Sequence, residues 1–250
     1  DLKLSYKIQG YEFMNQRGNW DGRYRLFDKK GSFPIGLLNS VEETFKRHNL
    51  SYRKVDNRLP LEYGESIPPV ENSQFKARDY QENAFKNCIK AGSGIVRMST
   101  GSGKTFVISS IAAHYNVPTC IYVIGKDLLY QMKSTIENAY GIECGIIGDG
   151  QIDIKRINVV SIWTAALAFK KKIKLSDNDF RQEKKIQSRL SEIQNVVNSA
   201  NLIILDECQY GGSDTFQFLS KESTNARHRF MFSGTPWRES GDDILLEAIS

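Results

Sequence analysis

The 250-residue sequence predicts an α/β fold, in which a parallel sheet with helices on both faces follows a small α+β domain. Three observations predict it. Near-continuous apolar runs of strand length recur after residue 73, and such runs are typical of parallel strands that are covered on both faces. Helical stretches separate most of these runs, which indicates crossover connections within one sheet. The residues before position 70 instead form short alternating segments between turn residues.

Residues 1–70 are expected to form the small domain. Arg23–Phe27 alternates polar and apolar residues, as a half-buried strand does. Asp21-Gly22 and Asp28–Gly31 supply hairpin turns on its two sides.

A helix is expected over residues 41–50, with Ser40 as its N-cap and Glu43 completing a capping box. The proline-rich residues 59–72 are interpreted as a linker to the second domain, which spans residues 73–250.

Basic and aromatic residues alternate in the small domain, and two interpretations are open. Arg23 and Arg25 would grip phosphates while Trp20 stacks on an unpaired base, which makes this a DNA-contacting module. Equally, alternating aromatic residues are typical of the buried face of a sheet, and the acidic residues between them nearly balance the charge.

The second domain is expected to alternate strands and helices. Its predicted strands are Gly94–Met98, Thr119–Ile124, Ile157–Ile162, Asn201–Asp206 and His228–Ser233. Phe180–Ser199 is predicted as a long polar helix on the surface, charged in its first half. Arg227 and Arg229, near the start of the last strand, are expected to be surface charges.

Composition narrows the class of protein. Hydrophobic residues make up 40% and charged residues 25%, the ordinary mixture of a globular protein, and no apolar run is long enough to span a membrane. The net charge of +5 permits a polyanionic partner without requiring one. The cysteines form no C-x-x-C pair, which argues against a zinc site and a disulfide scaffold and favours an intracellular protein; they are Cys88, Cys120, Cys144 and Cys208.

Met98–Thr105 follows the first predicted strand and opens a helix, as a phosphate-binding loop does. Gly101 and Gly103 allow a tight turn whose N–H groups face one anion at the helix N-terminus. Lys104, expected to be an exposed loop residue, reaches the β- and γ-phosphates, and the Thr105 hydroxyl is suited to ligate Mg²⁺. Met98 departs from the strict pattern, which has glycine there.

Asp206 and Glu207 stand at the carboxyl end of another predicted strand. In a parallel sheet that end lies beside the phosphate loop, which suits Asp206 for holding Mg²⁺. Glu207 would then orient the attacking water.

These motifs, in this order, resemble those of the superfamily 2 helicases. In that family the phosphate loop lacks the first glycine, which accounts for Met98. Asp206–Gln209 resembles the DEAD/DEAH box, with Gln209 where His or Asp is usual. Ser233–Pro236 resembles the third motif of the family, which couples the nucleotide state to nucleic-acid binding.

Three further segments extend the resemblance. Phe75–Gln81 is similar to the adenine-reading segment, in which an amide such as that of Gln81 pairs with N6 and N7 of the base. Gly125–Gln131 is similar to a strand-contacting motif, although Gly125 replaces the usual threonine, and Val160–Thr164 is similar to the next such motif. The spacing and the N-terminal module are most similar to the branch with the phage T4 recombination helicase and the XPB-like enzymes.

The resemblance implies a RecA-like lobe with four sets of site residues. The catalytic set is Lys104, Glu207 and Gln209, and Thr105 and Asp206 bind the metal. ATP is bound by Phe75, Arg78, Gln81, Thr100, Gly101, Ser102, Gly103, Lys104 and Thr105. Nucleic-acid binding or coupling is assigned to Gly125, Lys126, Trp163, Thr164, Ser233, Thr235, Arg23 and Arg25.

The implied function is ATP-dependent unwinding or remodelling of nucleic acid, with ATP and Mg²⁺ as cofactors. DNA, branched DNA included, is the expected partner and RNA the alternative, with a second RecA-like lobe in the full-length chain and no membrane. The expected location is intracellular, in the cytoplasm or nucleoid, or in the host cytoplasm for a viral protein. The alternatives are a restriction-system motor subunit, an RNA helicase, or, for this fragment alone, an ATP- and DNA-binding module without turnover.

Overall fold

A seven-stranded sheet forms the centre of the computed structural model, which describes residues 5–7, 23–27, 30–58, 60–70, 76–170, 180–208, 214–235 and 248–249. Its strands are β3 (Gly94–Arg97), β4 (Thr119–Val123), β5 (Cys144–Gly148), β6 (Gln151–Asp153), β7 (Ile157–Ser161), β8 (Leu202–Leu205) and β9 (His228–Ser233). They lie in the order β3-β9-β8-β4-β7-β5-β6, and every pair is parallel except β5 with β6. The predicted parallel α/β sheet is confirmed.

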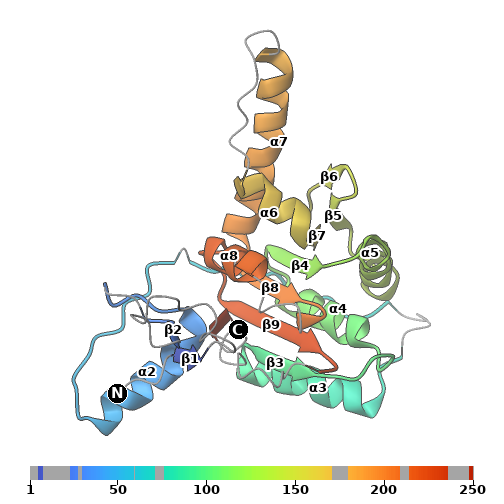
Figure 1. Ribbon diagram of the computed structural model, residues 1–250. Helices are drawn as coiled ribbons and strands as arrows, with labels where there is room; N and C mark the ends of the chain where they lie inside the picture. Colours follow the sequence, from blue (N-terminus) through green and yellow to red (C-terminus); the bar gives the residue numbers. More distant parts are fainter. Residues whose placement is uncertain are drawn as a thin grey trace.

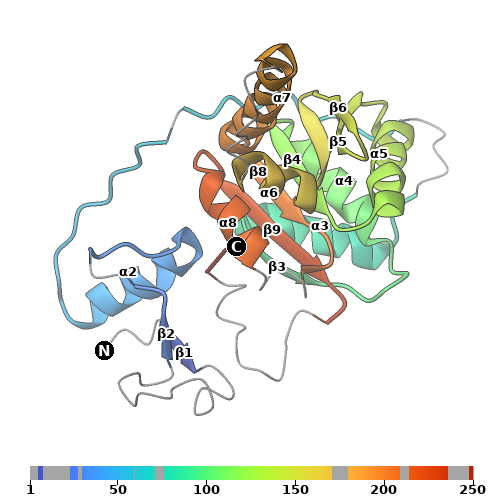
Figure 2. The same ribbon diagram turned by 45° about the horizontal axis from the view of Figure 1, so that its top comes forward.

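Helices cover both faces of this sheet (Figures 1 and 2). They are α3 (Asp79–Ala91), α4 (Lys104–Tyr115), α5 (Lys126–Tyr140), α6 (Ile162–Lys170), α7 (Phe180–Ser199) and α8 (Asp214–Glu222). One core joins α3, α4 and α5 to the sheet, and a second core joins α6, α7 and α8 to its other face. Among the described residues, no helix combines the length and apolarity that crossing a membrane requires.

Two strands and one buried arginine differ from the sequence-based expectation. β5 and β6 were not predicted, because Gly145 and Gly148 interrupt the apolar run of β5. Arg229, expected to be a surface charge, is only 7% exposed. Its guanidinium donates hydrogen bonds to the Ser220 carbonyl and hydroxyl and to the Ser223 carbonyl, which ties α8 to β9. Burial lowers the pKa of Arg229 to about 10.

The N-terminal residues form a separate two-stranded antiparallel sheet and a helix. Strand β1 (Ser5–Lys7) pairs with β2 (Arg23–Arg25), which lies within the predicted strand. The predicted turn at 21–22, the first two residues of the predicted turn at 28–31, and Trp20 lie outside the described residues, and Gly31 has the left-handed backbone (φ 84°) of a turn glycine.

The predicted N-cap of the N-terminal helix is wrong. Helix α2 (Leu38–Arg47) already contains Ser40, whose carbonyl accepts a hydrogen bond from the Thr44 hydroxyl. The 3₁₀ turn η1 (Ile35–Leu37) runs directly into α2, so the helix begins earlier than the capping pattern indicates.

Residues 56–58 and 60–70, most of which were predicted to be a linker, form an extended strap against the seven-stranded lobe (Figure 2). The amides of Gly64, Ile67 and Val70 donate to the carbonyls of Asn116, Ala113 and Ala139 at the ends of α4 and α5. Leu61 and Ile67 pack against the adjoining cores.

Charged and aromatic side chains hold the strap at a second place. Asp56 pairs with Arg58 and Arg227. These hydrogen bonds and charges, the hydrogen bond from Arg58 foremost, hold the pKa of Asp56 well below its usual range. The Tyr63 hydroxyl lies 2.8 Å from Nε2 of His228, whose ring stacks on Tyr115.

Removal of the strap is expected to destabilise the lobe, whereas removal of the preceding residues is not. Deleting residues 1–70 breaks the three backbone hydrogen bonds and exposes apolar surface, so we expect a loss of about 3 kcal/mol and a Tm lower by roughly 6–12 °C. Deleting residues 1–50 is the matched control, and its Tm should stay within about 3 °C of the parent. Equal Tm values for the two deletions, measured by calorimetry, would show that the strap contributes no stability.

Candidate nucleotide-binding site

The phosphate loop connects β3 to α4 at the carboxyl edge of the sheet. Gly101 (φ 77°) and Gly103 (φ 80°) have left-handed backbones, which glycine adopts without strain. Gly103 is the N-cap residue of α4, so the first N–H groups of that helix face the loop. This is the predicted strand–turn–helix, and it gives an anion a set of unpaired N–H donors.

Residues of the predicted adenine-reading segment hold the loop in place. The Ser102 carbonyl accepts hydrogen bonds of 2.9 Å from both the Tyr80 hydroxyl and Nε2 of Gln81. Oε1 of Gln81 accepts the backbone N–H of Arg78, whose guanidinium donates to the Tyr80 hydroxyl. Gln81 therefore caps α3 and supports the loop, and its contact with adenine stays a prediction. The role of Tyr80 was missed, because its position in the segment carries no pattern of its own.

A pocket of about 560 Å³ lies beside the loop. Its lining comes from the first turns of α3, from the end of β3 and from the loop itself, and consists of Tyr80, Ala84, Arg97, Met98, Ser99, Thr100, Gly101 and Ser102. Phe75, predicted to contribute to the nucleotide site, lies outside the described residues.

Replacement of Gln81 tests its two roles. Gln81→Ala is expected to weaken ATP binding by about tenfold, or 1.4 kcal/mol, because the base contact and the support of Ser102 are both lost. Inorganic triphosphate should lose less, since it has no base. Asn83→Ala on the exposed side of the same helix is the control. Equal losses for ATP and triphosphate in titration calorimetry would leave Gln81 with the supporting role alone.

Lys104, Glu207 and Asp206 form a charged cluster next to the loop. Nζ of Lys104 lies 3.1 Å from Oε1 of Glu207, and the Lys104 side chain is 8% exposed, so the expectation of an exposed loop lysine is wrong. The backbone N–H of Glu207 donates to Oδ1 of Asp206. Burial, followed by the Glu207 charge, raises the pKa of Asp206 to about 6, while Lys104 opposes the shift. Glu207 itself has a left-handed backbone (φ 57°), a strained conformation for this residue type.

The end of β9 contacts the phosphate loop directly. The Ser233 carbonyl accepts the N–H of Met98, and the Ser233 hydroxyl accepts the N–H of Thr235. A Cβ added to Gly234 would stand 3.4 Å from the Met98 carbonyl oxygen and 3.5 Å from the Thr100 nitrogen. A movement of the phosphate loop would therefore change the contacts of the Ser233–Thr235 segment. Pro236 and Gln209 lie outside the described residues.

The predicted strand-contacting residues begin two helices that follow adjacent parallel strands. Gly125 and Lys126 start α5 after β4, and Trp163 and Thr164 lie in the first turn of α6 after β7. Trp163 is 57% exposed. Lys126 forms an ion pair of 2.8 Å with Asp149, in the turn between β5 and β6.

Asp149 was missed by the sequence reasoning, because its strand pair was not predicted. It also accepts a hydrogen bond from Tyr130, and these contacts lower the pKa of Asp149. Arg23 and Arg25 are exposed on β2, which belongs to the other sheet and not to this cluster.

The fold and the site define a helicase-type motor lobe, and the comparisons with known proteins agree. Residues 74–238 match the family described as the type III restriction enzyme, res subunit, and the chain belongs to this family. The family match and the relatives below confirm the predicted resemblance to superfamily 2 helicases.

Two curated relatives of the chain are named as a DNA translocase and a DNA helicase. The chain is 27% identical over 182 residues to the DNA 3'-5' translocase XPB2 of Sulfurisphaera tokodaii, covering 72% of this chain and 36% of that protein. It is 26% identical over 127 residues to the ATP-dependent DNA helicase uvsW of Enterobacteria phage T4, covering 45% of this chain and 25% of that protein. The crystal structure of the UvsW helicase from bacteriophage T4 has the same fold, with a TM-score of 0.70, 16% identity and coverage of 98% and 88% of the two chains. The chain thus spans less than half of the length of these curated relatives.

Proposed function

We propose that this chain is the nucleotide-binding part of an ATP-dependent superfamily 2 motor that unwinds or remodels DNA. The observation that carries the proposal is the cluster of Lys104, Glu207 and Asp206 beside a phosphate loop that is hydrogen-bonded to Ser233. In this proposal Lys104 binds phosphate and Glu207 orients water. Ser233 couples the nucleotide state to nucleic-acid binding. The curated relatives that are named as DNA translocases and helicases support DNA as the partner.

The residues at the loop fit Mg²⁺. This ion usually keeps several waters and takes one or two carboxylates together with phosphate oxygens. The Asp206 carboxylate and the Thr105 hydroxyl would supply the protein ligands. No group of three His, Cys, Asp or Glu side chains gathers in the described part of the chain, so a cage built only from such side chains is not seen there. When bound, Mg²⁺ neutralises charge on the β- and γ-phosphates.

Phosphate binding requires the pair of Lys104 and Glu207 to separate. Lys104 moves its ammonium group to the γ-phosphate, and the Glu207 carboxylate, released from its partner, orients a water molecule for in-line attack. Because the Met98 N–H is bonded to the Ser233 carbonyl, a change in the loop passes to Ser233 and Thr235 at the end of β9. Lys126 and Trp163, at neighbouring strand ends, would then contact the nucleic-acid strand, and Lys126 would exchange Asp149 for a phosphate.

Hydrolysis measured with different nucleic acids tests this function. The full-length protein should hydrolyse ATP at least about tenfold faster when DNA is present than without it. The 250-residue chain alone should bind Mg·ATP with little turnover, as expected if a second RecA-like lobe completes the site. Stimulation by RNA but not DNA would favour the RNA helicase, and no stimulation by either would contradict the motor. Contact of Arg23 and Arg25 with DNA stays a prediction.

A further inference from the structure

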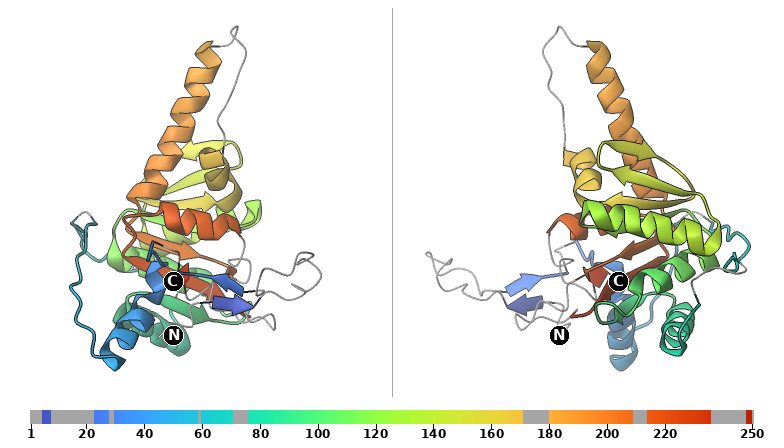
Figure 3. Two further views of the ribbon diagram at one scale, coloured as in Figure 1. Left: turned by 60° about the vertical axis from the view of Figure 1, so that its left-hand side comes forward. Right: turned by 90° about the vertical axis from the view of Figure 1, so that its right-hand side faces the viewer.

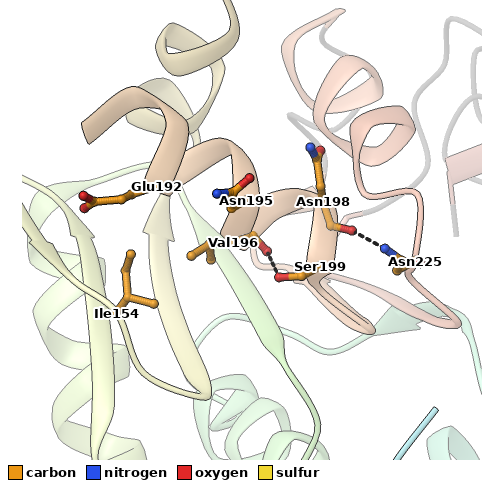
Figure 4. Close-up of a pocket in the computed structure, with 7 residues that line it drawn as sticks. All are labelled: Ile154, Glu192, Asn195, Val196, Asn198, Ser199 and Asn225. Carbon is orange, nitrogen blue, oxygen red and sulfur yellow. Dashed lines mark hydrogen bonds between the residues drawn. The ribbon is translucent and has the colours of Figure 1, made fainter. Parts of the chain in front are cut away.

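Helix α7 is a projecting arm whose carboxyl half packs on the lobe. Its 20 residues extend about 30 Å. Ile193 and Val197 are 3% and 0% exposed in the second core, and Nε2 of Gln194 donates to the Ala168 carbonyl of α6. At the root, Nδ2 of Asn225 donates to the Asn198 carbonyl, beside a pocket of about 550 Å³ (Figure 4).

The amino-terminal half of α7 extends beyond the rest of the described lobe in several views (Figures 1 and 3). Residues 184–189 are all exposed, including Ile186 at 38%. A helical segment without tertiary packing is marginal in water. Residues 184–189 therefore contribute little to the core, and their exposed side chains are available to a partner.

Three basic side chains line one side of this exposed half: Lys184, Lys185 and Arg189, here called the α7 stripe. At 100° per residue they span about 140° of the helix circumference, and the centre of this span lies roughly opposite the core-facing Leu190. None of the three forms an ion pair with another described residue.

The position of the α7 stripe opposes helix stability. Lys185 and Arg189 are like charges at i and i+4, which repel each other. Positive charges in the amino-terminal half of a helix also oppose its dipole, although the effect is largest in the first turn. A polyanion bound to the stripe would relieve both costs. Charge complementarity therefore favours an anionic partner over an apolar one.

We propose that the α7 stripe binds the phosphate backbone of a nucleic-acid duplex beside the motor, which rests on the proposed function for the identity of the polyanion. The arm packs on α6, which carries Trp163 and Thr164 at its start and exposes Leu167 at 48%. It thus projects from the helix that carries two of the predicted strand-contacting residues. Lys184 and Arg189 are separated by about 7.5 Å of helix axis. Since duplex DNA carries one phosphate per 3.4 Å of each strand, the stripe meets about two or three phosphates.

Neutralisation of the α7 stripe tests the proposal. The variant Lys184→Gln/Lys185→Gln/Arg189→Gln keeps helix-forming side chains and removes three charges. The matched control, Lys86→Gln/Lys90→Gln/Lys221→Gln, removes three exposed charges from α3 and α8. Binding of a 30-base-pair DNA duplex to the 250-residue chain is measured without nucleotide between about 50 and 200 mM salt, a range in which phosphate contacts are well resolved.

The stripe variant should bind duplex at least about tenfold more weakly at low salt, and its log–log salt slope should be shallower by about 2 to 3. The control should keep the parent slope within about 0.5. A slope for the stripe variant equal to that of the control would overturn the proposal, and would leave an acidic protein as the partner to seek. The proposed motor function is tested separately, by measuring ATP binding to the parent chain and its loss in Lys104→Ala. The two tests are independent because the duplex measurement contains no nucleotide. Far-UV circular dichroism of both variants should match the parent.

Discussion

Glu207→Gln in the full-length protein should retain ATP binding while its kcat falls by about 100-fold or more. The amide keeps the size of the side chain and loses the charge that orients the attacking water. Loss of the ion pair with Lys104 has a second effect. The lysine no longer has to leave a carboxylate before it meets the phosphates, so the affinity for Mg·ATP should rise rather than fall. Tighter binding combined with slower turnover is a result that a merely structural role would not produce.

Steady-state hydrolysis together with titration calorimetry checks this result. Glu143→Gln is the matched control, because Glu143 also pairs with a lysine, Lys155, but is 84% exposed on the surface. That variant should keep the kcat and the nucleotide affinity of the parent. A kcat for Glu207→Gln within about tenfold of the parent would remove Glu207 from the catalytic set.

Lys104→Ala should abolish detectable Mg·ATP binding and also destabilise the fold. The ammonium group is the cation that the loop directs at the phosphates, so its loss removes the charge that binds them. Because Lys104 is 8% exposed and lies against Glu207, its loss also removes a buried positive charge beside the carboxyl groups of Glu207 and Asp206. We expect the free energy of unfolding to fall by about 1–3 kcal/mol. The pKa of Asp206 should rise further above about 6, since Lys104 is the charge that lowers it. A larger fraction of Asp206 would then be protonated near neutral pH, which makes Asp206 a poorer ligand for Mg²⁺.

The double variant Lys104→Ala/Glu207→Gln separates the two effects. It removes one acid together with its partner, so stability should return toward the parent while nucleotide binding stays absent. Thermal unfolding and calorimetry on the 250-residue chain measure both quantities. Unchanged ATP affinity in a folded Lys104→Ala protein would contradict the assignment of the phosphate loop.

Much of the fold could be predicted from the sequence, because the patterns that indicate its strands and its phosphate loop lie within short stretches of the chain. The five predicted strands are apolar runs that pack between two helix layers, and this burial requires the continuous pattern that the sequence shows. The loop at Gly101–Lys104 was predicted for a similar reason, since its chemistry depends on residues that are adjacent in the chain. β5 escaped prediction because Gly145 has no side chain to continue the pattern.

Contacts between distant segments could not be predicted in the same way. The pair of Lys104 and Glu207 joins residues about a hundred positions apart, and no local pattern in the sequence shows that the two side chains meet. Burial of Arg229 depends on carbonyls at the end of α8 that face it. The prolines of the strap indicate an extended backbone, but the docking of that backbone depends on carbonyls exposed at the ends of α4 and α5.

Docking of the strap shortens the tether of the N-terminal module. Only residues 48–55 connect the end of α2 at Arg47 to the first strap contact at Asp56, a reach of roughly 30 Å when fully extended. The tether is shorter than this limit, because two contacts fold it back on α2. Lys54 forms an ion pair with Glu42, and the ring of Tyr52 contacts that of Phe45. This tether, together with the packing of Leu37 and Val41 on Ala248, holds the module at an effective concentration of at least about millimolar order beside the lobe. A ligand bound by both units would therefore gain avidity, even if each unit alone bound it weakly.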